Sequence, residues 1–176
     1  MDLKIKTDEE EFHGRSCGII KQGNKFLIMR VNKTSYYHIS GGHIEIGEDS
    51  EQAVIREIKE EIGCDVEKIK LFAIQENFWI RNNKKCHGIE FYYIIEPKQK
   101  LKMEDCEKIE IDKCEEKLLE LKWTTSEELK DMDLWNQIYK TIWFYGFYNQ
   151  LLSDRTCFVI LLNFFNLSNS LISSLV

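Results

Sequence analysis

The stretch Gly41 to Gly63 has the sequence GGHIEIGEDSEQAVIREIKEEIG, which combines a helix cap, a periodic apolar face and a cluster of glutamates. Asp49 or Ser50 can accept hydrogen bonds from the free N–H groups at the start of a helix. Apolar residues then recur near the 3.6-residue helical period, at Ala53, Val54, Ile55, Ile58 and Ile62. We predict a helix over about residues 51–62, with these residues in the core and with Gly63 as the left-handed residue that ends it.

Three glutamates, Glu57, Glu60 and Glu61, fall on one face of that helix, because positions i, i+3 and i+4 are neighbours there. Crowded carboxylates repel each other, and a hard divalent cation relieves that repulsion. Mg²⁺ prefers oxygen ligands and is typically held by one or two carboxylates together with substrate phosphates. The cluster therefore predicts a magnesium site for a phosphorylated substrate. The alternative is a solvated acidic face, with Arg56 and Lys59 as ordinary partners.

Residues before the helix favour a magnesium site over a solvated acidic face. Gly42 is followed after five residues by Glu48, and after seven more by Arg56-Glu57-Ile58-Lys59-Glu60-Glu61-Ile62-Gly63. This pattern resembles the Nudix box without a gap, and only Cys64 departs from it, at a position that is usually aliphatic. The resemblance covers residues 14 to about 148. It implies an α+β Nudix fold, in which a mixed β-sheet is sandwiched between α-helices.

The resemblance also implies roles for the box residues. It implies a metal site in which Glu48 acts through water and Gly42 through its carbonyl oxygen; the full set is Gly42, Glu48, Glu57, Glu60 and Glu61. It implies catalytic roles for Glu57, Glu60 and Arg56, with Arg56 orienting a glutamate. Mg²⁺ is the expected cofactor, and Mn²⁺ is a possible substitute. The general base stays open among Glu57, Glu90, Glu104, Asp105 and Glu107.

The implied reaction is hydrolysis of a diphosphate bond in a nucleoside diphosphate linked to a group X. The short chain and the lack of downstream subfamily signatures favour a MutT-like nucleoside triphosphate pyrophosphohydrolase. Hydrolysis of ADP-ribose or another nucleotide sugar, and nucleotide sensing without turnover, stay open. A base needs an apolar surface with a few polar contacts. The candidates for substrate binding are Tyr37, Phe78 and Glu90, with Phe12, Tyr36 and Trp79 as further aromatic candidates.

Outside the box the sequence pattern predicts mainly strands. A hairpin is predicted from residues 15–20 and 25–31, with turn residues between them. Further strands are expected at 36–39, 71–76, near Ile80, at 87–96 before Pro97, and at 118–123. The charged residues 102–117 are interpreted as a solvated loop or a broken element. Thr125 and Glu128 form a capping-box pattern that predicts a short helix, and a second helix is expected over about 134–148.

Composition limits the organisation and the partners. A chain of 176 residues suits one domain, over 1–148, followed by a tail at 149–176 that we expect to be helical or poorly ordered. No charged residue occurs from Thr156 to Val176, yet its amides and hydroxyls disfavour a membrane anchor.

The net charge of −6 disfavours nucleic-acid partners and messenger-RNA decapping, so we expect a small nucleotide substrate. Six cysteines without a CxxC pair predict reduced thiols in a cytoplasmic protein, and their spacing does not indicate a zinc site. We expect a monomer or a homodimer.

Overall fold

The computed structural model describes residues 1–112, 115–134 and 161–163. Its helical elements are α1 (Ser50–Glu57), the π-helix η1 (Ile58–Ile62) and the 3₁₀ helix η2 (Glu128–Asp131). Its strands are β1 (Lys4–Lys6), β2 (Glu10–Gln22), β3 (Lys25–Val31), β4 (Ser40–His43), β5 (Val66–Arg81), β6 (Lys84–Pro97), β7 (Cys106–Asp112), β8 (Glu115–Thr125) and β9 (Leu161–Asn163).

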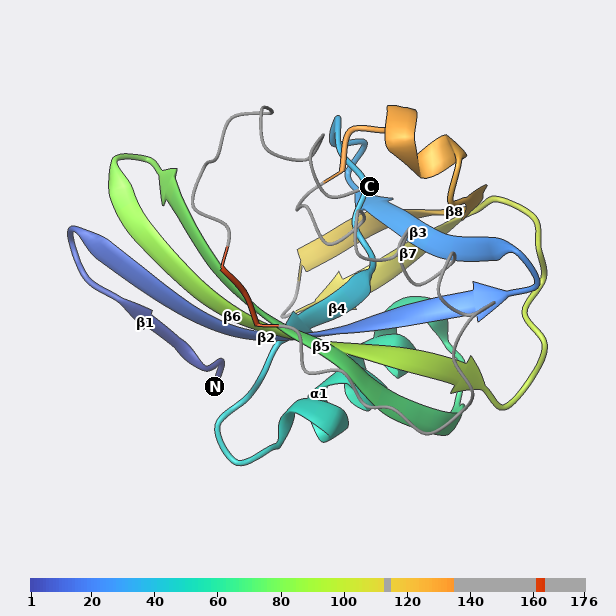
Figure 1. Ribbon diagram of the computed structural model, residues 1–176, viewed down its shortest axis with the longest axis horizontal. Coiled ribbons are helices and arrows are strands. Elements are labelled where there is room, and N and C mark those ends of the chain that lie inside the picture. Colours follow the sequence, from blue (N-terminus) through green and yellow to red (C-terminus); the bar gives the residue numbers. More distant parts are fainter. Residues whose placement is uncertain (113–114, 135–160, 164–176) are drawn as a thin grey trace, which may run out of the picture.

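Strand β2 joins the two halves of the sheet. It pairs antiparallel with β1, β3 and β4, and parallel with β6 along eleven register positions from Glu10 to Ile20. The strand order is β7-β8-β3-β2-β6-β5-β9, with β1 and β4 attached to β2 (Figure 1). Because antiparallel and parallel pairs meet on β2, the sheet is mixed, as the α+β Nudix fold requires.

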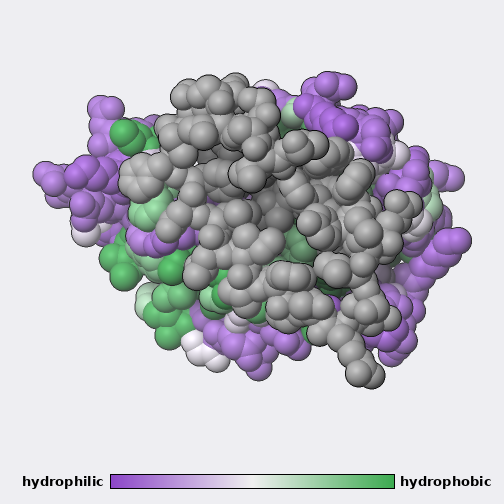
Figure 2. Space-filling model, viewed as in Figure 1, coloured by the Kyte–Doolittle hydropathy of each residue, from purple (hydrophilic) through white to green (hydrophobic). Residues whose placement is uncertain are grey.

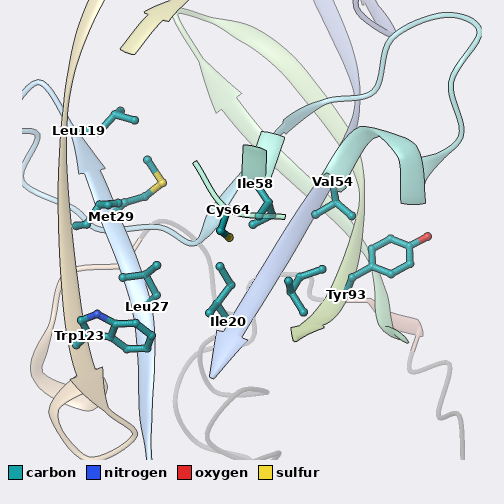
Figure 3. Close-up of a cluster of buried hydrophobic side chains, with 11 residues drawn as sticks. Ile20, Leu27, Met29, Val54, Ile58, Cys64, Tyr93, Leu119 and Trp123 are labelled. Atoms are coloured by element: carbon teal, nitrogen blue, oxygen red, sulfur yellow. The ribbon is translucent and has the colours of Figure 1, made fainter. Parts of the chain in front are cut away.

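Helix α1 is held against the sheet by a core that both halves share. Val54 and Ile58 are fully buried and pack with residues of β2, β3, β6 and β8 (Figure 3). Burying each such side chain stabilises the fold by about 1.5 to 3 kcal/mol. Gly18 of β2 lets the helix come close, because a Cβ there would lie 2.9 Å from Ile58 Cδ1. The apolar packing of Val54 and Ile58 therefore fixes the position of the box helix on the sheet.

Several sequence predictions are confirmed. The β2–β3 hairpin turns at Gly23, β6 ends at Pro97, and β8 covers the predicted strand at 118–123. Thr125 and Glu128 exchange the predicted capping hydrogen bonds at the start of η2. The four cysteines within the described residues (17, 64, 86 and 106) are free thiols.

Other predictions are wrong for identifiable reasons. Residues 102–117, expected as a solvated loop or a broken element, contain β7 at 106–112 and the start of β8 at 115, because the pairing of β7 with β8 satisfies the backbone of a charged segment. The two strands expected at 71–76 and near Ile80 are one long strand, β5. Ile55 is 38% exposed and not core, since only the Val54 and Ile58 side of the helix faces the sheet. Residues 36–39 make only isolated bridges, and the strand begins at Ser40.

The tail is described only in part. Leu161–Asn163 pairs with β5 as a short parallel strand and is not helical. The helix expected at 134–148 and the rest of 149–176 lie outside the described residues, apart from Leu134. Within the described part of the chain, no helix is long and apolar enough to cross a membrane. Figure 2 shows hydrophilic residues over both ends of the visible face and hydrophobic residues gathered at its lower left.

Candidate active site

The box helix begins and ends at the predicted residues. Asp49 accepts from the backbone N–H of Gln52 at 2.8 Å, and the Gln52 side chain accepts from the Asp49 N–H at 3.0 Å. After Glu57 the helix widens into η1, where the Gly63 N–H donates to the Ile58 carbonyl at 3.1 Å. Gly63 has the expected left-handed conformation, with φ of 81°. η1 has wider turns than an α-helix, so the angular spacing of Glu60 and Glu61 differs from that of a regular α-helix.

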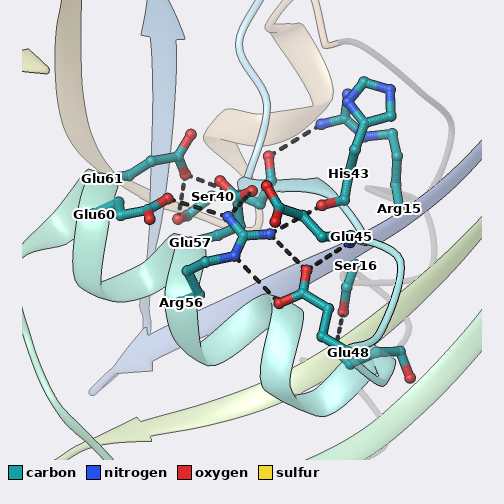
Figure 4. Close-up of polar contacts among 12 residues, drawn as sticks. Arg15, Ser16, Ser40, His43, Glu45, Glu48, Arg56, Glu57, Glu60 and Glu61 are labelled. Carbon is teal, nitrogen blue, oxygen red and sulfur yellow. Dashed lines mark hydrogen bonds and ion pairs between the residues drawn. The ribbon is translucent and has the colours of Figure 1, made fainter. Parts of the chain in front are cut away.

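Arg56 is the centre of the polar network. Its guanidinium donates to Glu48 Oε1 at 2.7 Å, to Glu57 Oε1 at 2.7 Å and to Glu60 Oε2 at 3.1 Å (Figure 4). It also donates to the His43 carbonyl at 3.0 Å, which links the helix to β4. The hydrogen bond from Arg56 lowers the pKa of Glu48, so this carboxylate is kept ionised. Arg56 thus orients three of the glutamates expected at the site.

Glu57 lies against the backbone of β4. A Cβ on Gly42 would overlap its carboxylate, so only glycine leaves room for Glu57 at this position. Burial raises the pKa of Glu57, although Arg56 acts in the opposite direction. A carboxylate that has lost solvent in this way is stabilised by any further cation that reaches it. Glu57 and Gly42 are therefore adjacent, as the box pattern predicts.

Glu61 is the buried member of the group, with 7% of its surface exposed. Its Oε2 accepts from Ser40 Oγ at 2.5 Å and from the Gly41 N–H at 2.9 Å. Gly41 has φ of 148°, and a Cβ there would overlap the carbonyl of Ser16. Gly41 therefore permits the close approach of β4 to β2, and Glu61 joins the end of the helix to that strand.

Arg15 of β2 is a site residue that the sequence analysis missed. Its guanidinium donates to the Gly41 carbonyl at 3.1 Å, and its charge lowers the pKa of Glu57, although burial outweighs it. Glu90 of β6 lies opposite Arg15 in the parallel register. No local pattern marks Arg15, because it meets the box only through the antiparallel pairing of β2 with β4, which sets Arg15 opposite His43. Arg15 supplies a second cation beside the glutamates.

The residues present fit a divalent cation. The carboxylates of Glu48, Glu57 and Glu60 converge on Arg56, and Glu61 bonds Ser40 beside the Gly41 carbonyl that Arg15 contacts. Four carboxylates thus meet two guanidinium groups, so negative charge stays in excess. Lys108 Nζ adds a cation only at the backbone carbonyls of Glu60 and Glu61, at 2.7 and 3.2 Å. The absent Cβ of Gly42 leaves its backbone accessible beside Glu57. Hard oxygen donors in excess of their cations are the donor set of Mg²⁺.

The candidate substrate residues do not form one group. Phe78 is half exposed and stacks on His87, with ring centroids 4.4 Å apart, and Phe12 meets the same imidazole edge-on. Tyr37 instead lies under Arg30 and Lys122, at 5.2 and 5.8 Å. Trp79 lies beside His13. Phe12 and Phe78 thus share a cluster, whereas Tyr37 has a different set of neighbours.

The base candidates also differ in their surroundings. Glu90 is buried and accepts from the Tyr92 hydroxyl. Asp105 accepts from the backbone N–H of Trp123 at 3.1 Å, and Glu107 lies opposite Glu120 of β8. Glu57 alone among the candidates lies against the Gly42 backbone and bonds Arg56.

Comparison with known families bears on this arrangement. The profile of the NUDIX domain family matches residues 12–142, which include the whole box and the strands around it. The chain belongs to the NUDIX domain family. Among solved structures, the Nudix fold is matched by the mutator MutT protein of Bacillus halodurans, with a TM-score of 0.57 and 18% identity over 74% of this chain and 82% of that one. A Nudix hydrolase family member of Chromobacterium violaceum has a TM-score of 0.52 and 20% identity, over 85% of this chain and 84% of that one.

Three curated relatives are similar over shorter stretches. An RNA pyrophosphohydrolase of Wolbachia pipientis is 37% identical over 81 residues, which are 44% of this chain and 47% of that protein. The NAD-capped RNA hydrolase NudC of Vibrio atlanticus is 41% identical over 58 residues, 32% and 22% of the two chains. An ADP-ribose pyrophosphatase of Methanocaldococcus jannaschii is 41% identical over 56 residues, 30% and 32%. The matches span less than half the length of each relative.

Proposed function

We propose that this NUDIX domain is a Mg²⁺-dependent pyrophosphohydrolase that cleaves a phosphoanhydride at the 5′ side of a nucleotide. The observation that carries the proposal is the convergence of Glu48, Glu57 and Glu60 on Arg56, beside a glycine that leaves room for Glu57. The names of the relatives support the same bond type, since each describes hydrolysis of a pyrophosphate linkage or a nucleotide cap.

Each residue has a task in this reaction. Gly42, Glu48, Glu57, Glu60 and Glu61 would hold the cation, as direct ligands or through water. When bound, Mg²⁺ neutralises the diphosphate and lowers the pKa of an attacking water. Arg56 orients three carboxylates and lowers the pKa of Glu48, and Arg15 offers positive charge on the β2 side. Glu57 is placed to accept a proton, because burial raises its pKa towards that of a working base.

The finer proposal is a nucleoside triphosphate substrate, which yields a nucleoside monophosphate and pyrophosphate. A second candidate is the 5′ end of an RNA, because two of the relatives carry names of that kind. An RNA chain needs cations along its backbone, and the net charge of −6 works against it. ADP-ribose is the third candidate. All three share the nucleoside diphosphate unit that the site is proposed to bind.

A substrate panel with matched variants tests both levels. The purified chain with Mg²⁺ is offered nucleoside triphosphates, ADP-ribose, 5′-triphosphorylated RNA and NAD-capped RNA. The products are separated and quantified by chromatography, because hydrolysis of ADP-ribose or NAD-capped RNA releases neither free phosphate nor pyrophosphate. Glu57→Gln should lower kcat on the preferred substrate by at least about 100-fold, because loss of even an outer partner of a metal site costs 10- to 100-fold.

The control is Glu51→Gln, since Glu51 is an exposed glutamate in the first turn of the same helix and bonds none of the site residues. It should keep full activity. Equal activity of Glu57→Gln and Glu51→Gln would refute the metal assignment. Preference for an RNA end over a free triphosphate would replace the finer proposal and leave the bond type standing.

A further inference from the structure

A second cluster of ligating side chains lies outside the Arg56 network. The ligand atoms of Glu11, His13 and Cys86 all lie within 4.8 Å of one another. Within the described residues, no other set of three His, Cys, Asp or Glu side chains meets that condition. All three side chains are buried. Glu11 and His13 share one face of β2, and Cys86 lies opposite Glu11 in the parallel register with β6.

The spacing suits a tetrahedral transition-metal ion. His13 Nε2 lies 3.2 Å from Glu11 Oε2. Two ligands of one tetrahedral Zn²⁺, with bonds of about 2.0 to 2.2 Å, are separated by about 3.4 Å. Nitrogen and carboxylate are therefore already close to the separation that a shared ion needs. The Cys86 sulfur adds the soft donor that separates zinc sites from magnesium sites.

His43 provides the outer partner that a ligating histidine needs. His13 Nδ1 lies 3.0 Å from His43 Nε2. When His13 carries its proton on Nδ1 and donates it to His43, the Nε2 lone pair faces Glu11 and Cys86. Histidines that bind metals almost always have such a hydrogen bond on the other ring nitrogen, which sets the tautomer and the ring orientation.

The cluster holds a cation already, supplied by an arginine. Arg81 bonds Glu11 Oε2, and the same nitrogen lies 3.5 Å from His13 Nε2. Lys6 Nζ is 3.4 Å from Glu11 Oε1. Both cations come from exposed side chains, 41% and 59% accessible, whereas Glu11 is 5% accessible. Arg81 and Lys6 can therefore withdraw into solvent, but the ligands cannot.

We propose that Glu11, His13 and Cys86 form a Zn²⁺ site that is separate from the carboxylates of the box. On binding, the Cys86 thiol releases its proton to solvent and forms a bond to the ion, and the Arg81–Glu11 ion pair breaks. One carboxylate and one thiolate balance the two charges of Zn²⁺, so the buried site is neutral once Arg81 leaves. Water takes the fourth position. Mg²⁺ does not compete, because it prefers oxygen ligands.

Co²⁺ is the spectroscopic probe for this site. The full chain, stripped of transition metals and kept in excess Mg²⁺, is titrated with Co²⁺ and then with Zn²⁺. One equivalent should produce the thiolate-to-cobalt charge-transfer band, and Zn²⁺ should remove it. Cys86→Ser should abolish the band, whereas Cys64→Ser should keep it, since Cys64 is an equally buried thiol at the end of the box. A wild-type chain without the band, or a band that survives in Cys86→Ser, would overturn the proposal.

Arg81→Gln provides a test that does not depend on how well Cys86→Ser folds. Removing the competing cation should tighten Co²⁺ binding by at least about tenfold, because a charge a few Å from the ion opposes it strongly. Unchanged or weaker binding in Arg81→Gln would show that the ion does not take the place of the guanidinium, and would reject the site. The outcome is independent of hydrolysis, so it can be told apart from failure of the proposed function.

Discussion

At the scale of single residues, the two glycines at the start of the box have different tasks. Gly41 adopts φ of 148° and approaches the carbonyl of Ser16, so its neighbour is backbone. Gly42 has no such dihedral constraint, and its neighbour is the end of the Glu57 side chain. Backbone cannot move aside, whereas a carboxylate can rotate away. A substitution at Gly41 should therefore mainly lower the stability of the fold, whereas one at Gly42 should mainly lower the activity.

Alanine at each position tests this difference. Gly41→Ala should lower the free energy of unfolding by about 2 to 5 kcal/mol, through a strained dihedral and a backbone overlap. Gly42→Ala should cost about 1 kcal/mol or less and still reduce kcat, because the Glu57 carboxylate is displaced. Urea unfolding and turnover are measured on both variants. A stable, active Gly41→Ala, or a Gly42→Ala with unchanged kcat, would contradict this assignment.

At the scale of elements, α1 presents the site because both of its ends are defined. The Asp49–Gln52 capping box sets its start, and the π-turn of η1 followed by Gly63 sets its end. The extra width of η1 turns Glu61 inward to Ser40 and Gly41, while Glu60 stays half exposed beside Arg56. One sequence run thus supplies both a buried anchor and a solvent-facing carboxylate.

Removing the cap should weaken the fold without altering the site chemistry. Asp49→Ala should lower the free energy of unfolding by about 1 kcal/mol, because a backbone N–H at the helix start loses its acceptor. For a chain of this size the melting temperature should fall by about 2 to 4 °C. Asp49→Asn, which keeps an acceptor oxygen, is the control and should lose much less. Equal loss in the two variants would point to charge and not to capping.

At the scale of the whole molecule, histidines held neutral make stability depend on pH. Burial lowers the pKa of His38 from 6.5 to about 4, and burial likewise lowers that of His43 to about 4. Between about pH 4 and pH 6.5 these two histidines are protonated in the unfolded chain and neutral in the folded chain. Stability should therefore rise with pH across this window and be lost as the pH falls from about 6.5 towards 4.

His38→Gln isolates one part of this effect. The wild-type chain should lose about 1 to 3 kcal/mol through His38 across the window, a range that allows for the partial exposure of the ring. The variant should show a shallower fall in unfolding free energy from urea titrations at several pH values. Above about pH 7.5 the two proteins should share one pH dependence, because both histidines are then neutral in either state. Parallel curves throughout would exclude His38 as a contributor.

The helix, its cap, its terminal glycine and the box residues followed from the sequence, because they depend on neighbours within four or five positions. The β2–β3 hairpin and the end of β6 at Pro97 were predictable for the same reason. The strand at 106–112 was not, because its charged residues take β-structure only through pairing with β8.

Only the tertiary structure decided which cations and ligands stand together across the sheet. Arg15 comes beside the box through the antiparallel pairing of β2 with β4. Cys86 comes beside Glu11 through the parallel pairing of β2 with β6. That pairing joins residues 75 positions apart, so no spacing along the chain reveals it. The sequence by itself determined the family pattern and the carboxylates of the box. The fold determined that Arg56 gathers three of them, that Glu61 is buried, and that a carboxylate, an imidazole and a thiol meet elsewhere.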